Sequence, residues 1–155
     1  MSLLWGYMRN FGVVFLLSLF ASLAACSETA EPVTTSYSQA QIQEAKVIAV
    51  LSYAEWCASC KILTPKINQL RADYEAKGMV FVSLDFTDKN ISEFYAEAAK
   101  DGVEGPVRNY FNGGIITGRL MLLSPQGEML TRPVNMNHTP DEIRARFDKA
   151  LQKAG

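Results

Sequence analysis

The chain has 155 residues, 48% hydrophobic and 20% charged, as in an ordinary globular protein, which excludes a collagen-like, low-complexity or wholly disordered chain. Fifteen Lys and Arg against sixteen Asp and Glu leave a net charge of −1, so the chain has no long-range attraction for phosphate and no nucleic-acid partner is expected. The single histidine, His138, excludes metal sites built from several histidines.

The first 25 residues have the pattern of a secretory signal peptide. They hold one charged residue, Arg9, and an uncharged stretch over residues 11–25, FGVVFLLSLFASLAA. This stretch is shorter than the roughly 20 apolar residues of a membrane-spanning helix. A positive start, a short apolar run and small residues at its end predict export across a membrane.

Cys26 follows this stretch directly. The string Leu23-Ala24-Ala25-Cys26 resembles the lipobox of bacterial lipoproteins, in which signal peptidase cuts before a cysteine whose thiol carries a diacylglycerol. The resemblance implies a lipid anchor on Cys26 and accounts for the odd number of three cysteines. The alternatives are an uncleaved signal anchor, or ordinary cleavage beside an incidental Cys26.

Residues 27–37, SETAEPVTTSY, are polar and lack periodicity, so we predict a flexible tether. Such a segment spans about 20 Å root-mean-square. The expected organisation is a lipoprotein signal peptide over residues 1–25, the lipidated cysteine and tether over residues 26–37, and one folded domain over residues 38–155.

The folded part begins with a helix, a strand and a longer helix. Ser38 followed by Gln41 is a capping-box pattern that predicts a short helix to about residue 46. Residues 47–53, VIAVLSY, form an apolar run typical of a strand buried on both faces. Apolar residues then recur at helical spacing over residues 57–76.

A second strand is predicted over residues 79–85, MVFVSLD, and a helix over residues 90–100. Residues 103–118 contain four glycines and one proline without a clear period, so we expect a loop there. A third strand is predicted over residues 120–123.

The last elements are a hairpin and a helix. Ser124-Pro125-Gln126-Gly127 is a turn sequence, after which residues 128–132 are expected to pair back as a strand. Thr139 and Pro140 start a helix that runs to about residue 153. Strands separated by helices are expected to pair in parallel, and the last two to form an antiparallel hairpin. The predicted fold class is α/β, a mixed sheet with helices on both faces.

A C-x-x-C pair, Cys57 and Cys60, lies where the first strand meets the long helix. The free N–H groups and the dipole of a helix N-terminus favour a thiolate at Cys57. Cys60 is one turn later, near enough for a disulfide. We expect Cys57, the more exposed thiol, to attack, and the more buried Cys60 to resolve the mixed disulfide.

The stretch Tyr53–Lys61, YAEWCASCK, resembles the active site of the thioredoxin superfamily, especially of its periplasmic, membrane-tethered reductases. Pro65 matches the proline that kinks the family's active-site helix, and Gly127-Glu128 matches its hairpin turn. The resemblance covers most of residues 38–153. It implies a thioredoxin-like fold, dithiol–disulfide exchange through the two cysteines, and no cofactor beyond their disulfide.

Two structural interpretations of the cysteine pair stand beside this one. A zinc site needs four ligands, and one Cys pair with His138 cannot supply them, so no metal is expected. An inert disulfide across one helical turn closes almost no loop and would stabilise little.

Trp56, beside the pair, is expected to shield the sulfur and to form part of a docking surface.

The sequence departs from the family's pattern in its buried acid. Thioredoxins commonly hold a buried acid six residues before the first cysteine, with a lysine on the next strand, and the matching positions here are Leu51 and about Phe81. Glu55 is a candidate substitute base, and the alternative is a solvated charge.

The second departure concerns the cis-proline that the family places against its cysteine pair. Counting back from Gly127 puts this position at Arg119, within a residue. A cation there would favour the Cys57 thiolate, and the alternative is an exposed edge charge. A different alignment uses Gly105-Pro106.

The residues therefore predict a thiol–disulfide oxidoreductase, lipid-anchored in a bacterial cell envelope and facing the periplasm. Its expected partners are envelope proteins with cysteine pairs, which it reduces, and an unidentified electron donor. The alternatives are an oxidase or isomerase of the same fold, and a non-catalytic thioredoxin-like module for binding or metal delivery.

Overall fold

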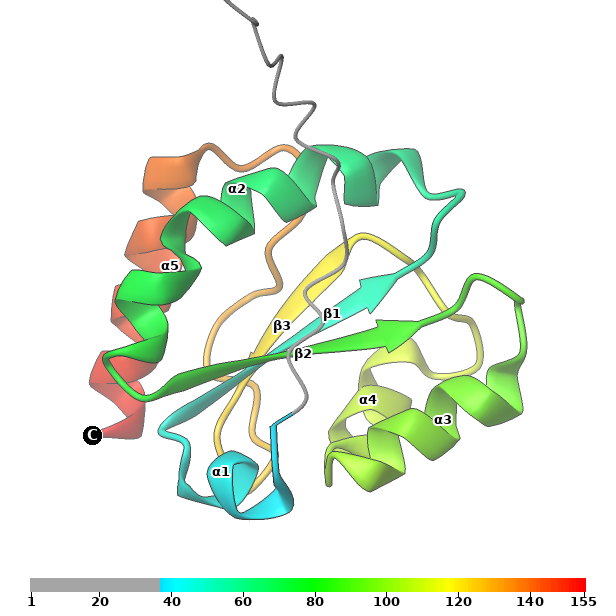
Figure 1. Cartoon of the computed structure of the whole chain (residues 1–155), viewed down its shortest axis with the longest axis horizontal. Coiled ribbons are helices and arrows are strands. Elements are labelled where there is room, and N and C mark those ends of the chain that lie inside the picture. Colours follow the sequence, from blue (N-terminus) through cyan, green and yellow to red (C-terminus); the bar gives the residue numbers. More distant parts are fainter. Residues whose placement is uncertain (1–36) are drawn as a thin grey trace, which may run out of the picture.

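The computed structural model describes residues 37–155 (Figure 1). The predicted signal peptide, Cys26 and residues 27–36 of the predicted tether lie outside the described residues. Within residues 37–155 no helix is long and apolar enough to cross a membrane.

A three-stranded sheet forms the centre of the domain. Its strands are β1 (Val47–Tyr53), β2 (Met79–Asp85) and β3 (Arg119–Leu123), in the order β2-β1-β3. The central strand β1 is buried along its whole length, as its apolar sequence predicts. It pairs in parallel with β2 and antiparallel with β3, so the sheet is mixed.

Helices cover both faces of this sheet (Figure 1). On one face α2 (Ala58–Glu75) and α5 (Pro140–Ala154) pack against the odd-numbered residues of β1. On the other face α1 (Gln39–Glu44), α3 (Ile91–Lys100) and α4 (Glu104–Phe111) pack against its even-numbered residues. The alternation follows from the two-residue period of a strand, and it confirms the predicted α/β class.

Local signals set the helix starts as predicted. Ser38 and Thr139 are the N-caps of α1 and α5, and each forms a full capping box with the residue three positions on, Gln41 and Glu142. Asn90 caps α3 through its side-chain oxygen. The strands β1 and β2 begin and end at the predicted residues.

The expected loop over residues 103–118 was wrong in its first half, where α4 forms. Pro106 lies in the first turn of α4, and its missing N–H costs nothing there because first-turn N–H groups have no partner within a helix. The helix ends at Asn112, whose backbone is left-handed (φ 38°).

The third strand runs antiparallel to β1, and the expectation of parallel pairing across a helix was wrong for it. A single helix after β2 would return the chain to the end of the sheet where β1 and β2 start, but two helices, α3 and α4, follow β2 in the chain and lie side by side (Figure 1). The second helix brings the chain back to the end of the sheet where β1 and β2 finish, so β3 starts beside the end of β1.

The predicted return of residues 128–132 antiparallel to β3 is present, with a bridge between Met129 and Leu123 and a hydrogen bond from the Leu130 N–H to Leu122 O at 2.8 Å. Only the expectation of a regular strand there was wrong, because the bridges to β3 are isolated. Pro133 has no N–H to give to a ladder. Two carbonyl oxygens of the segment accept hydrogen bonds from side chains of α5. Lys153 donates to Leu130 O at 2.7 Å, and Arg146 donates to Arg132 O at 2.9 Å. The chain thus follows β3 without forming a regular fourth strand.

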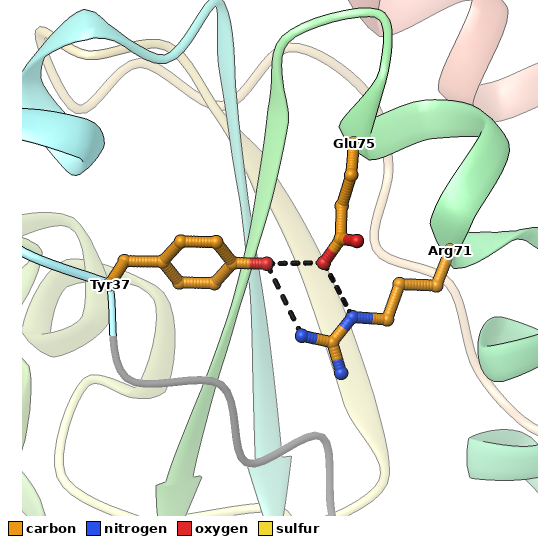
Figure 2. A network of polar contacts seen from close by, with 3 residues as sticks. All are labelled: Tyr37, Arg71 and Glu75. Carbon is orange, nitrogen blue, oxygen red and sulfur yellow. Dashed lines mark hydrogen bonds and ion pairs between the residues drawn. The ribbon is translucent and has the colours of Figure 1, made fainter.

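Tyr37 fastens the start of the described chain to the last turns of α2 (Figure 2). Its hydroxyl donates to the Glu75 carboxylate and accepts from an Arg71 guanidinium nitrogen at 3.2 Å, while Arg71 Nε donates to the same carboxylate at 2.6 Å. Burial alone would raise the pKa of Glu75, but the hydrogen bonds from Tyr37 and Arg71 outweigh it and lower that pKa. We call these three residues the tether clasp.

Candidate active site

The cysteine pair lies where the carboxyl end of β1 passes into α2. Cys57 and Cys60 form a disulfide, with 5.2 Å between their Cα atoms. The chain turns tightly after β1, with the Cys57 N–H donating to Ala54 O at 3.1 Å, and Cys57 becomes the N-cap of α2. The fold therefore delivers the first sulfur to a helix N-terminus, as the sequence predicts.

Two hydrogen-bond donors surround the Cys57 sulfur. The backbone N–H of Cys60 donates to Cys57 Sγ at 3.1 Å, and Ser59 Oγ lies 3.2 Å from the same sulfur. Both groups would favour the thiolate once the disulfide is reduced, as would the dipole of α2. Cys57 is 4% exposed and Cys60 is wholly buried, which is the order of access that the predicted roles require.

Trp56 and Glu55 directly precede Cys57 in the chain, and both are exposed. Trp56 is 50% exposed, and its Nε1 donates to Thr87 O at 2.8 Å while its ring meets the Phe86 ring edge-on. Glu55 is exposed and its N–H donates to Thr87 Oγ1 at 3.0 Å. Exposure fits the docking role predicted for Trp56. The base role of Glu55 stays a prediction.

The positions of the family's buried acid and lysine are filled by core side chains. Leu51 and Phe81 are each 1% exposed, and Phe81 packs edge-on against Phe147. The carbonyl oxygen of Ser52 lies 3.7 Å from Cys60 Sγ. The described core around Cys60 thus offers a main-chain acceptor at this place.

Gly118 is the residue that the structure places against the disulfide, one position before the predicted Arg119. A Cβ atom at Gly118 would clash with the Ser59 side chain and lie 3.5 Å from Cys57 Sγ. Its φ of +76° also disfavours any other residue. Arg119 instead begins β3, where it pairs with Ser52.

The alternative alignment through Gly105-Pro106 was wrong, whereas the count to Arg119 came within one residue of Gly118. The described residues contain no cis peptide bond. Pro106 packs against the turn at Gly127, where an added Cβ would lie 2.6 Å from Pro106 Cγ, so the structure puts it at a different place from the disulfide.

Ser52 is a site residue that sequence reasoning missed. Its side chain is wholly buried, and its Oγ donates to Ile116 O at 2.8 Å and accepts from the Arg119 N–H at 3.2 Å. Its own carbonyl accepts from the Gly118 N–H at 2.7 Å. The sequence held one sign of this role, a hydroxyl in an otherwise apolar strand. A buried hydroxyl needs hydrogen-bond partners, so Ser52 could be expected to bind a neighbouring segment.

Residues 37–155 hold no group of three or more His, Cys, Asp or Glu side chains arranged for a metal ion. His138 lies in the loop before α5, where its Nδ1 contacts Asn135. Two exposed apolar side chains lie close to the site residues in sequence: Ile62 follows Cys60 by two residues, and Ile116 precedes Gly118 by two.

Comparison with known proteins finds a matching family profile and solved structures of low sequence identity. The profile of the thioredoxin family matches residues 28–103, which include the cysteine pair. A protein described as thiol:disulfide interchange protein DsbE from Chlorobium tepidum is 19% identical, with a TM-score of 0.48 over 72% of this chain and 84% of its own. The thioredoxin domain of a thiol-disulfide oxidoreductase from Bacteroides vulgatus is 17% identical, with a TM-score of 0.43 over 70% and 81%.

Proposed function

Because this chain belongs to the thioredoxin superfamily and carries the cysteine pair of a thiol–disulfide oxidoreductase, we propose that it reduces protein disulfides in a bacterial cell envelope. The observation that carries the proposal is the disulfide between Cys57 and Cys60 at the start of α2. The partners proposed are envelope proteins with cysteine pairs and a donor of electrons.

The reaction starts from the dithiol. The Cys57 thiolate attacks one sulfur of the substrate disulfide, whose S–S bond breaks, and the departing substrate sulfur takes up a proton. Cys60 then loses its proton and attacks Cys57 Sγ, which releases the second substrate sulfur as a thiol. Two electrons and two protons pass to the substrate, and the donor must return both to the Cys57–Cys60 disulfide.

The geometry supports this division of labour. Cys57 Sγ is the sulfur with the Cys60 N–H and Ser59 Oγ beside it, so its thiolate is stabilised before attack. Cys60 is covered by the core, so it reacts with Cys57 Sγ in the mixed disulfide and does not meet a substrate sulfur directly. Exposed Trp56 and Ile116 offer apolar surface to an unfolded or extended substrate segment.

We expect the full-length protein in detergent to catalyse reduction of insulin by dithiothreitol, and the Cys57→Ser, Cys60→Ser double variant to give no rate above the uncatalysed reaction.

A reductase should have a reduction potential below about −200 mV, whereas a value near about −120 mV is that of a strong oxidant. Titration against glutathione buffers measures it. Catalysis with an oxidising potential would favour the oxidase alternative.

The non-catalytic alternative has its own supporting observation. Leu51 and Phe81 are apolar and buried where the family commonly keeps an acid and a lysine, and no cis-proline occurs among residues 37–155. An intact disulfide with no insulin reduction above the background of the double variant would favour a binding or metal-delivery module.

We also propose that Cys26 carries the lipid that holds the domain at a membrane, facing the periplasm. The support is the lipobox-like string before it and the apolar stretch over residues 11–25. Cys26→Ser should leave an unprocessed precursor without palmitate label, while wild type takes up the label. The Cys57→Ser variant is the matched control for loss of a thiol. Normal processing of the Cys26→Ser chain would contradict the proposal.

A further inference from the structure

The segment over residues 116–119 is fastened to β1 by one residue. Ser52 Oγ lies 2.8 Å from Ile116 O and 3.2 Å from the Arg119 N–H, and the Ser52 carbonyl accepts the Gly118 N–H at 2.7 Å. Ser52 is wholly buried, so water does not compete for these bonds. One side chain thus holds the chain on both sides of Gly118.

What Ser52 holds in place is a backbone that faces the active sulfur. Gly118 is buried, and the direction of its missing Cβ points at Ser59 and Cys57 Sγ. A proline would fix this conformation by its own ring, but glycine has more backbone freedom than any other residue. The position of Gly118 must therefore come from its neighbours, and the hydrogen bonds of Ser52 supply it.

Ser52 also faces the second cysteine. Its carbonyl oxygen lies 3.7 Å from Cys60 Sγ, so it can accept the S–H of Cys60 in the dithiol as well as the N–H of Gly118. The residue therefore contacts Cys60 directly and Cys57 only through Gly118.

We propose that Ser52 is a positioning residue: its hydroxyl holds Gly118 against Cys57 and so sets how fast the site reacts with protein disulfides. This inference rests on the proposed function. A protein substrate must fit over Gly118 to bring its disulfide to Cys57, whereas a small disulfide needs no such surface. Loss of the hydroxyl should slow the first reaction and leave the second nearly unchanged.

The first test is amide hydrogen exchange followed by NMR on the oxidised full-length protein in detergent. In wild type, the Gly118 and Arg119 amides should exchange as slowly as those inside β3. In Ser52→Ala they should exchange at least about tenfold faster relative to Leu122. Ser83→Ala is the matched control, because Ser83 Oγ is buried in the neighbouring strand without a partner, and it should leave both amides unchanged.

The second test compares two substrates. Ser52→Ala should lower kcat/KM for insulin about tenfold, and should change the rate at which glutathione disulfide oxidises the dithiol less than twofold. Ser52→Thr keeps the hydroxyl and should recover most of the insulin activity.

Several results would overturn the role of Ser52. They are fast exchange of Gly118 and Arg119 already in wild type, an equal loss for insulin and glutathione disulfide, or an equal insulin loss in Ser83→Ala. A wild type that reduces no insulin would defeat the proposed function instead, and the exchange measurements would still decide whether Ser52 holds Gly118.

Discussion

A Cys60→Ser variant, reduced and then mixed with an oxidised substrate protein, should accumulate a covalent mixed disulfide through Cys57. Attack by Cys60 is intramolecular, and well-placed intramolecular groups reach effective molarities of about 10⁵ M or more. Without it, release must wait for an external thiol, which at about 1 mM is about 10⁸-fold more dilute than such an effective molarity, so the mixed disulfide should persist. The Cys57→Ser variant should trap almost nothing, because Cys60 is wholly buried.

Non-reducing electrophoresis and mass spectrometry of the trapped species measure this difference. The double variant without either cysteine gives the background, and Ser59→Ala is a control that keeps both sulfurs while removing the hydroxyl 3.2 Å from Cys57 Sγ. Trapping by Cys57→Ser as strong as by Cys60→Ser would show that the roles of the two cysteines are reversed or shared.

Leu51→Asp should destabilise the domain by about 3 kcal/mol or more. Leu51 is 1% exposed in the central strand, between Ser83 of β2 and Leu120 of β3. The substitution removes buried methyl groups, which typically costs about 2–5 kcal/mol, and adds a polar group without a designed partner. Urea unfolding of the oxidised protein measures the change.

The pH dependence separates charge from shape in this variant. Burial would raise the folded-state pKa of the new carboxyl above its unfolded value of about 3.9. The variant therefore keeps its full free energy of unfolding below about pH 3.9, where the carboxyl is neutral in both states, and loses part of it as the pH rises through the folded-state pKa. Leu51→Asp should therefore come closer to wild type at acid pH. Leu51→Met, with similar volume, should cost less than about 1.5 kcal/mol at every pH. A neutral or stabilising Leu51→Asp would mean that water reaches this position.

Much of the fold was readable because its signals are local. The apolar runs of β1 and β2 and the caps at Ser38 and Thr139 each depend on a few neighbouring residues. The direction of β3 was not readable, because it depends on two helices returning the chain together. The helix α4 was hidden by Gly105 and Pro106, which weaken a helix interior but are tolerated in its first turn.

The candidate site also has a part that local sequence predicts and a part that depends on distant residues. Cys57 and Cys60 are neighbours in sequence, and their spacing predicts a disulfide at a helix start, which the structure contains. Gly118 meets Cys57 across some sixty residues, and counting from the Gly127 turn came within one position of it. The partners of Ser52 lie equally far along the chain, and no short pattern could name them.

The tether clasp has a consequence for where the reactive sulfur points. Helix α2 has 18 residues, so it is a rod of about 27 Å with Cys57 at its first end and Arg71 and Glu75, which hold Tyr37, near its last. With a lipid on Cys26, the membrane would pull on one end of this rod while the sulfur occupies the other. Because residues 27–36 are predicted to be flexible, the domain can still turn, but the sulfur would on average lie farther from the bilayer than Tyr37 does.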